Sequence, residues 1–225
     1  MRILFTKKNL DKKLLAEALG QPIIYDLVDV IKTRRIDIEP FHLKDKSIIF
    51  TSVKGVESFF KNGFTPCEVF TEKNYNRIYC VGKKTKKEVR KYGYGTYKVK
   101  KHARDLAEFI LKNSQGERFL HFCGNLALDV LDKALPLQNI SYKKIPVYET
   151  ILLYPEIKDS YDAVVFFSPS GVRSYLKNNS LENKLLFSIG QTTEKEIKKH
   201  TKTKVYSSSE SNLEDLLKTI LKHLK

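Results

Sequence analysis

Hydroxyl side chains stand where two apolar runs give way to helical patterns. Ser52 follows a run that ends at Phe50, and Ser168 follows one that ends at Phe167. A serine before a helix caps its first backbone N–H groups, and Pro169 suits the first helical position. The other N–H groups of such a turn point past the end of the strand, where they can bind an anion. We therefore predict anion-contacting caps at both serines.

Two threonines occupy comparable places further along. Thr85 and Thr193 each follow a strand pattern and a glycine, and each stands three residues before a glutamate. Thr-x-x-Glu is the capping-box pattern, which predicts that both threonines start helices. Most such threonines serve only the helix. The alternative is that the same hydroxyls also face carboxylates of a ligand.

The sequence lacks the residue patterns of a nucleophilic serine, a metal site or a nucleotide-binding loop. Neither Ser52 nor Ser168 has a neighbouring His or Asp to make it a nucleophile. The five histidines show no metal-ligand spacing, the three cysteines no paired spacing, and the glycines no phosphate-binding pattern. We therefore expect no metal and no cofactor. Tyr148 is open to two readings, a cross-strand aromatic contact or a hydroxyl that faces ligand, and its spacing favours the first.

The chain contains a long internal repeat. Residues 48–63 and 164–179 are identical at seven of sixteen positions, including Ser52/Ser168 and Gly55/Gly171. The similarity continues downstream for most of each half. A period of a little over a hundred residues suits a duplicated α/β lobe rather than a solenoid. We expect two lobes facing each other, with a cleft lined by the loops at their strand ends.

Strands alternating with helices predict an α/β fold with a parallel sheet in each lobe, flanked by helices. Two alternating segments read as the connections between lobes, possible partners of one another. The N-terminal lobe is then completed by the C-terminal third. The predicted boundaries are 1–36 with 151–225 for the first lobe, 40–146 for the second, and 36–41 and 145–151 for the connecting strands.

Composition restricts the partners. The net charge is +15 and the pI about 9.5, which fits solvated surface lysine, an anionic ligand or nucleic acid. Dispersed lysines and the lack of an RNA-recognition motif argue against nucleic acid. No apolar run is long enough to span a bilayer, and the first residues do not form a signal peptide. Unpaired cysteines favour a reducing cytosol, so we expect a cytoplasmic protein, and a monomer by default.

Short motifs along nearly the whole chain resemble those of the uroporphyrinogen-III synthase family. They are Phe50-Thr51-Ser52 with Val56, Val81-Gly82 with Thr85, Phe122 to Leu126, Val147 to Thr150, Phe166 to Gly171, and Ile189-Gly190 with Thr192 and Thr193. Each motif alone is weak. Their order, spacing and coverage together make the resemblance fairly specific.

The resemblance implies a two-lobed α/β lyase with a two-stranded connection. Its reaction would be the cyclisation of hydroxymethylbilane, a linear tetrapyrrole with eight carboxylates, with loss of water and inversion of ring D to give uroporphyrinogen III in haem biosynthesis. It would need no cofactor, metal, membrane or nucleic acid, and it could contact the preceding pathway enzyme transiently. A non-catalytic two-lobed protein that binds a polyanion is the alternative.

The resemblance also implies site residues. Tyr148 matches the tyrosine suspected of helping the hydroxyl to leave. Lys7 stands where many members carry arginine, which keeps the charge but loses bidentate geometry. The expected substrate-binding residues are Thr6, Lys7, Thr51, Ser52, Gly82, Thr85, Gly124, Asn125, Ser168, Pro169, Ser170, Gly171, Gly190, Thr192 and Thr193.

Overall fold

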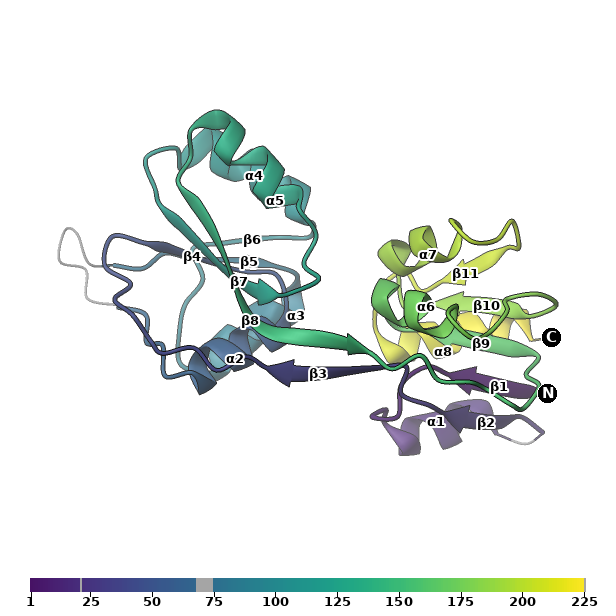
Figure 1. Cartoon of the computed structure of the whole chain (residues 1–225). Helices are drawn as coiled ribbons and strands as arrows, with labels where there is room; N and C mark the ends of the chain where they lie inside the picture. The colour runs from purple at the N-terminus through teal and green to yellow at the C-terminus, as the bar shows by residue number, and fades with distance from the viewer. Residues whose placement is uncertain (21, 68–74, 225) are drawn as a thin grey trace. The chain divides into compact units, whose positions relative to one another are not determined.

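The computed structural model describes residues 1–20, 22–67 and 75–224 (Figure 1). The chain forms two compact units. Unit 1 comprises residues 1–32 and 151–225, and unit 2 comprises residues 33–150. Each unit is a mixed α/β structure with its own sheet, so the predicted fold class is confirmed at that level.

The sheet of unit 1 has the strand order β11-β10-β9-β1-β2, and its neighbouring strands are parallel. Its strands are β1 Arg2–Phe5, β2 Ile24–Leu27, β9 Ala163–Phe166, β10 Leu185–Ser188 and β11 Val205–Ser207. Its helices are α1 Lys12–Leu19, α6 Pro169–Tyr175, α7 Gln191–Ile197 and α8 Leu213–His223.

The sheet of unit 2 has the order β3-β8-β7-β4-β5-β6, parallel from β8 to β6. Its strands are β3 Ile31–Arg35, β4 Ser47–Phe50, β5 Ile78–Val81, β6 Lys98–Lys100, β7 Phe119–Gly124 and β8 Tyr142–Leu152. Its helices are α2 Val53–Lys61, α3 Lys83–Lys91, α4 Ala103–Asn113, α5 Val130–Ala134 and the 3-10 turn η1 Pro136–Gln138.

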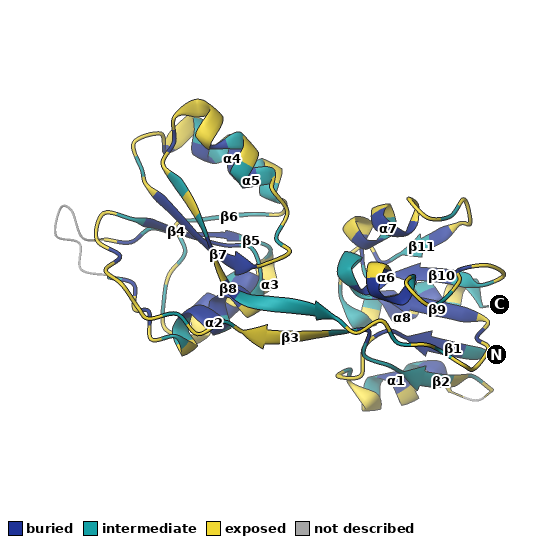
Figure 2. Ribbon diagram, viewed as in Figure 1, coloured by how far each residue is buried: buried dark blue, intermediate teal, exposed yellow. Residues whose placement is uncertain are grey.

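Both faces of each sheet are covered, which explains why the central strands read as continuous apolar runs (Figure 2). In unit 2, α2 and α3 pack on one face and α4 and α5 on the other. In unit 1, α6 and α7 pack on one face and α1 and α8 on the other. The four resulting apolar layers are the cores that hold the strand ends in place.

The two units are the same structure in different chain order. The strands β4, β5, β6, β7 and β8 of unit 2 correspond, in this order, to β9, β10, β11, β1 and β2 of unit 1. With this correspondence, the sheet orders β8-β7-β4-β5-β6 and β2-β1-β9-β10-β11 are the same. Unit 1 is therefore a circular permutation of unit 2. The repeat at 48–63 and 164–179 is the β4–α2 and β9–α6 element of this common structure.

Each sheet has a point where the helices change face. In unit 2 it lies between β4 and β7, and in unit 1 between β9 and β1. Loops leaving the carboxyl ends of two such strands diverge to opposite faces and leave a crevice, where open α/β sheets bind ligands. The repeated Ser52 and Ser168 stand at these two points.

Some local predictions were wrong. The first connecting strand is β3, Ile31–Arg35, rather than residues 36–41. Ile36 N–H still donates to the Val147 carbonyl of β8, 3.0 Å away, but the chain then turns so that Phe41 packs on Phe64. The second connection, predicted at 145–151, lies within the longer β8, and β8 is the neighbour of β3 as the alternating patterns suggested.

None of the helices in the described ranges is both long and apolar enough to cross a membrane.

The repeated glycines predict different tolerance to a methyl group. A Cβ on Gly55 would lie 2.8 Å from the Phe122 carbonyl oxygen, whereas one on Gly171 would meet a Val30 methyl at 3.3 Å. Backbone cannot yield as a side chain can, so we expect Gly55→Ala to destabilise by about 2–3 kcal/mol and Gly171→Ala by about 1 kcal/mol or less. Urea unfolding measures both. Equal losses would contradict the close packing of α2 on β7.

Candidate functional site

Ser52 links the start of α2 to Tyr148. Its Oγ accepts the N–H of Gly55 at 3.0 Å, which caps the helix, and lies 3.1 Å from the Tyr148 hydroxyl. Behind the tyrosine lies Gly124, where a Cβ would stand only 2.5 Å from the ring carbon Cζ. The ring therefore fits against β7 because residue 124 has no side chain. These three residues form the centre of the candidate site in unit 2.

A β-bulge directs Tyr148 to this place. The β7–β8 register shifts between Cys123, opposite Pro146, and Gly124, opposite Tyr148. The extra residue puts Val147 and Tyr148 against the same apolar layer, although successive residues of a regular strand face opposite sides. Burial raises the pKa of the Tyr148 phenol, and the Ser52 hydrogen bond only partly opposes that rise. The hydroxyl is therefore protonated at neutral pH and can donate.

Thr51 contacts a residue that sequence reasoning missed. Its Oγ1 lies 2.9 Å from Nε2 of His121, whose Nδ1 lies 2.7 Å from the Tyr142 hydroxyl. Burial, and then the charge of Lys144, lower the pKa of His121 to about 4, so the ring is neutral at pH 7. Its position inside an apolar strand, Phe119–Gly124, was the available signal, since a buried histidine needs polar partners.

Unit 1 carries the corresponding hydroxyls without the tyrosine. Ser168 Oγ accepts the N–H of Gly171 at 3.0 Å and lies 3.1 Å from Ser170 Oγ, with Pro169 at the first helical position. Thr6, at the end of neighbouring β1, is buried, and its Oγ1 donates to the Val165 carbonyl at 2.8 Å. The structure thus brings Thr6 and the Ser168 turn to adjacent strand ends.

Lys7 follows Thr6 and is exposed. Its Nζ lies 6.0 Å from the centroid of the Phe167 ring, at the same strand ends as the Ser168 turn. A flexible ammonium in this place can reach an anion without a fixed fork geometry.

The predicted capping boxes at Thr85 and Thr193 are wrong. The caps of α3 and α7 are Gly82 and Gly190, three residues earlier, and neither makes a side-chain cap. Both threonines are instead buried inside the first turn. Gly82 has φ +88°, a conformation that favours glycine, and it starts the helix without a side-chain cap.

The remaining predicted residues lie at the same strand ends but differ in role. Asn125 is exposed, and its Oδ1 accepts the N–H of Thr150 at 2.9 Å, which ties the turn after β7 to β8. Gly190 lies against Ser211, since a Cβ there would stand 2.5 Å from Ser211 Oγ. Thr192 is exposed at the start of α7.

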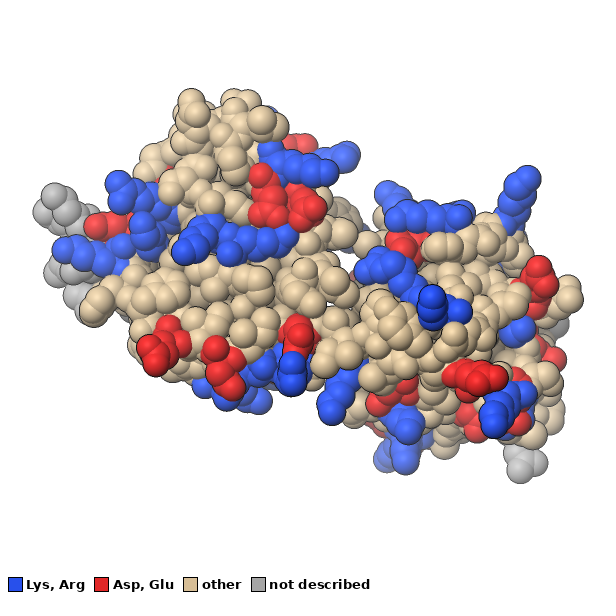
Figure 3. Space-filling view, in the orientation of Figure 1, with Lys and Arg blue, Asp and Glu red and all other residues tan. Residues whose placement is uncertain are grey.

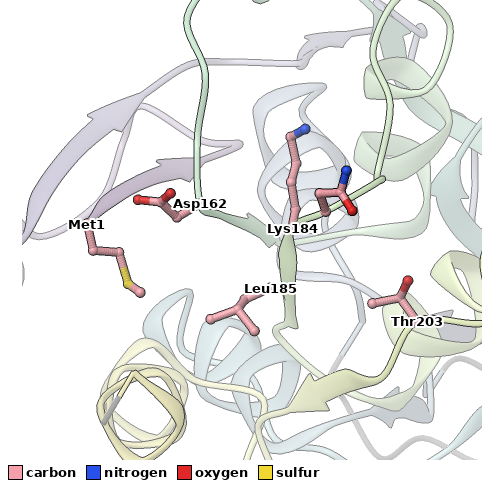
Figure 4. Close-up of a pocket in the computed structure, with 6 residues that line it drawn as sticks. Met1, Asp162, Lys184, Leu185 and Thr203 are labelled. Carbon is pink, nitrogen blue, oxygen red and sulfur yellow. The ribbon is translucent and has the colours of Figure 1, made fainter.

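A depression of about 560 Å³ lies at the opposite edge of the unit 1 sheet (Figure 4). Its lining includes Met1, Asp162 and Leu185, at the amino ends of strands, and Lys184 and Thr203. Ligands of open parallel sheets bind at the carboxyl ends, so this depression does not belong to the candidate site.

On the face shown in Figure 3, lysine and arginine side chains lie on both units, interspersed with acidic side chains. A few lysines are paired with acids on or next to their own helix, as Lys91 with Glu88 in α3 and Lys199, just beyond α7, with Glu196. Such surface pairs contribute little stability, and they leave a net excess of cations available to an anionic ligand. Within the described residues, no group of three or more His, Cys, Asp and Glu is arranged to hold a metal ion.

Two α/β units, each with a parallel sheet and a serine-capped helix start at its switch point, define the class as a two-unit α/β protein. The family model for uroporphyrinogen-III synthase HemD matches residues 10–218. The chain belongs to this family, whose members are lyases of tetrapyrrole synthesis acting on a small tetrapyrrole. Its function is thus that of a uroporphyrinogen-III synthase in haem biosynthesis, and a purely binding role is not favoured.

Solved structures share the fold. The uroporphyrinogen-III synthetase of Helicobacter pylori 26695 is 19% identical with a TM-score of 0.67, and all of both chains is covered. A mutant uroporphyrinogen III synthase of Thermus thermophilus is 14% identical with a TM-score of 0.69, covering 99% of this chain and 97% of that one. The wild-type Thermus enzyme gives 14% identity and 0.54 over the whole of both chains. No curated protein matches the sequence significantly.

His121 predicts a stability change with pH. Its pKa is about 4 in the folded protein against about 6.5 when unfolded, so between these values the unfolded chain binds more protons. Stability should be full above pH 6.5 and fall as pH drops toward 4, by about 3 kcal/mol in total from this group.

Urea unfolding at pH 7, 5.5 and 4.5 measures this fall. His121→Gln removes this group and should make the fall in stability with decreasing pH shallower. His200→Gln, at an exposed position, should leave the pH dependence of stability as in the wild type. The same slope in all three proteins would show that His121 does not titrate in this range.

Proposed function

We propose that this chain cyclises hydroxymethylbilane to uroporphyrinogen III, as a hydro-lyase that removes water and inverts ring D. The observation that carries the residue-level proposal is the Tyr148 hydroxyl, held 3.1 Å from Ser52 at the switch point of unit 2 in a chain of this family. We propose further that it acts without a cofactor, as a cytoplasmic monomer that meets the preceding pathway enzyme only transiently.

The substrate's eight carboxylates explain the residue types at the strand ends. Helix starts at Ser52 and Ser168 offer backbone N–H groups and partial positive charge, which suit carboxylates without a metal. The helices α3 and α7 also start at these strand ends, each at a glycine that brings no capping side chain of its own. Lys7 adds a full charge beside the Ser168 turn. We propose that these groups bind substrate.

Positioning of the substrate accounts for much of the proposed rate enhancement. A flexible linear tetrapyrrole must be held with its two ends together before the ring can close, and fixed geometry removes that entropic cost from the chemical step. The bound carboxylates are remote from the reacting carbons. Their binding energy can therefore hold the last pyrrole ring in the orientation that leads to inversion.

Tyr148 is proposed to assist the leaving hydroxyl. Its raised pKa keeps the phenol protonated, so it can donate a hydrogen bond to the hydroxymethyl oxygen as the carbon–oxygen bond breaks. The electron-rich first ring, which carried the hydroxymethyl group, stabilises the resulting cation, and a pyrrole carbon of the last ring then attacks it. The Ser52 contact fixes the direction of the phenol.

Product analysis tests the reaction. Hydroxymethylbilane closes unaided to the uninverted isomer I, so the purified protein is expected to give mostly isomer III. Chromatography of the oxidised products with and without protein separates the isomers. Isomer I alone, with tight substrate binding to folded protein, would support a non-catalytic binder instead.

Tyr148→Phe tests the site. We expect kcat to fall at least 10-fold with little change in KM, because the lost hydroxyl acts as the bond breaks. Tyr175→Phe is a matched control, since Tyr175 is also a buried tyrosine but lies in the core of unit 1. Wild-type kcat in Tyr148→Phe would return the residue to a structural role.

A further inference from the structure

Helix α3 of unit 2 carries a cation at every position that is not buried. Its buried positions are Thr85, Glu88 and Val89. The other six positions of this nine-residue helix are Lys83, Lys84, Lys86, Lys87, Arg90 and Lys91. The single carboxylate of the helix, Glu88, is buried and pairs with Lys91 at 2.8 Å. We call the six cations the α3 face.

The charge of the α3 face opposes the stability of its own helix. Residues three and four apart are neighbours on a helix surface, so Lys83 lies beside Lys87, and Lys87 beside Arg90. Like charges at these spacings are destabilising, and cations in the first turn face the positive end of the helix dipole. The one carboxylate of the neighbouring α2, Glu57, is itself paired with Lys54 at 2.6 Å. The α3 face therefore does not serve the folding of α3.

The corresponding helix of unit 1 lacks such a face. α7 follows β10 as α3 follows β5, and these two strands are counterparts in the common structure. The exposed positions of α7 are Gln191, Thr192 and Lys195, and its Glu194 pairs with Lys198 just beyond the helix. The common structure thus forms without a row of cations at this place. The charge of α3 needs an explanation outside the fold.

The α3 face begins at the edge of the sheet that carries the candidate site. β5 and β4 are neighbouring parallel strands, so α3 and α2 start at the same edge, where Ser52 caps α2. A helix of nine residues is about 13 Å long. At an ionic strength of about 10 mM the Debye length is about 30 Å. All six charges therefore act on an anion that approaches these strand ends.

We propose that the α3 face captures the polycarboxylate substrate and speeds its arrival at the strand ends of unit 2. Charges of one sign beside a binding site raise the local concentration of an oppositely charged ligand and its association rate. Hydroxymethylbilane, with eight carboxylates, is a ligand on which such a field acts strongly. The proposal deepens the proposed function and rests on it for the identity of the substrate.

The residue types of the α3 face favour carboxylates over nucleic acid. Five of its six cations are lysine, whose compact, hydrated ammonium makes contacts without fixed geometry, whereas arginine supplies the bidentate fork used in nucleic-acid recognition. The helix has no aromatic side chain on which a base could stack. These features suit a small polyanion that passes over the face rather than a strand bound along it.

Kinetics at two salt concentrations test the capture. The variant Lys83→Gln/Lys87→Gln/Arg90→Gln removes three exposed cations and keeps good helix formers. At an ionic strength of about 10 mM, kcat/KM for hydroxymethylbilane should fall about 3- to 10-fold, mainly through KM. At about 1 M, where the charges are screened, the variant and the wild type should agree. Equal kcat/KM values at low salt would overturn the proposal.

A control variant separates the α3 face from total charge. Lys112→Gln/Lys202→Gln/Lys222→Gln also removes three exposed cations, in the last turns of α4 and α8 and before β11, at the opposite edges of the two sheets. It should keep the wild-type kcat/KM at low salt, and a fall equal to that of the α3 variant would contradict the proposal. Urea unfolding checks folding, because removal of like charges should leave the α3 variant at least as stable as the wild type.

Uroporphyrin, the stable oxidised form of the expected product, tests capture without turnover. It is fluorescent and keeps eight carboxylates, so stopped-flow fluorescence measures its association at low salt. Association should be slower in the α3 variant and unchanged in the control. Equal rates in the wild type and the α3 variant, or no association with the wild type, would overturn the proposal. So would RNA binding that the α3 variant loses while its uroporphyrin association stays unchanged. A wild type that forms no isomer III would instead refute the proposed function, and the uroporphyrin rates would still decide whether the α3 face captures a polycarboxylate.

Discussion

The hydroxyl of Ser52 serves two structures at once. It accepts the Gly55 N–H that would otherwise be unpaired at the start of α2, and it contacts the phenol of Tyr148. Both contacts need backbones in unusually close approach, with Gly55 against the Phe122 carbonyl and Gly124 against the tyrosine ring. Because these glycines lie on α2 and β7, the helix, the strand and the phenol are fixed relative to one another. The orientation of the proposed catalytic group is therefore a consequence of core packing.

Duplication supplied this arrangement twice, and only one copy carries the tyrosine. Both repeats have a serine cap bonded to a glycine N–H at 3.0 Å, and both place it at the switch point of a sheet with the same strand order. The two units differ in the strand at the edge of this common structure, β8 in unit 2 and β2 in unit 1, which come from different parts of the chain. Unit 2 has the long, bulged β8, whereas the corresponding β2 of unit 1 is four residues long. A shared helix-capping element thus has chemically distinct surroundings in the two units.

The sequence could predict the elements that depend on local pattern. The apolar runs predicted to end at Phe50 and Phe167 are β4 and β9, which end at Phe50 and Phe166. The repeat located Ser52 and Ser168 as caps because capping is a local hydrogen bond. It could not predict the bulge, since the register of β8 depends on its pairing with a strand some twenty residues away. The Thr-x-x-Glu pattern misled for a related reason. Gly82 and Gly190 start those helices, and the threonines are buried by contacts that only the tertiary structure supplies.

Buried polarity is what separates the site from its surroundings. Most of the unit 2 sheet is covered by apolar side chains, yet His121 on β7 and Tyr142 on β8 are retained there with hydrogen-bond partners. Among the residues described, no buried side-chain nitrogen or oxygen lacks a partner. A satisfied polar series in a core adds little net stability over apolar packing, but it fixes hydrogen positions that packing alone leaves free. Its value here is positional, because it holds the Thr51 side chain in place next to the Ser52–Tyr148 pair.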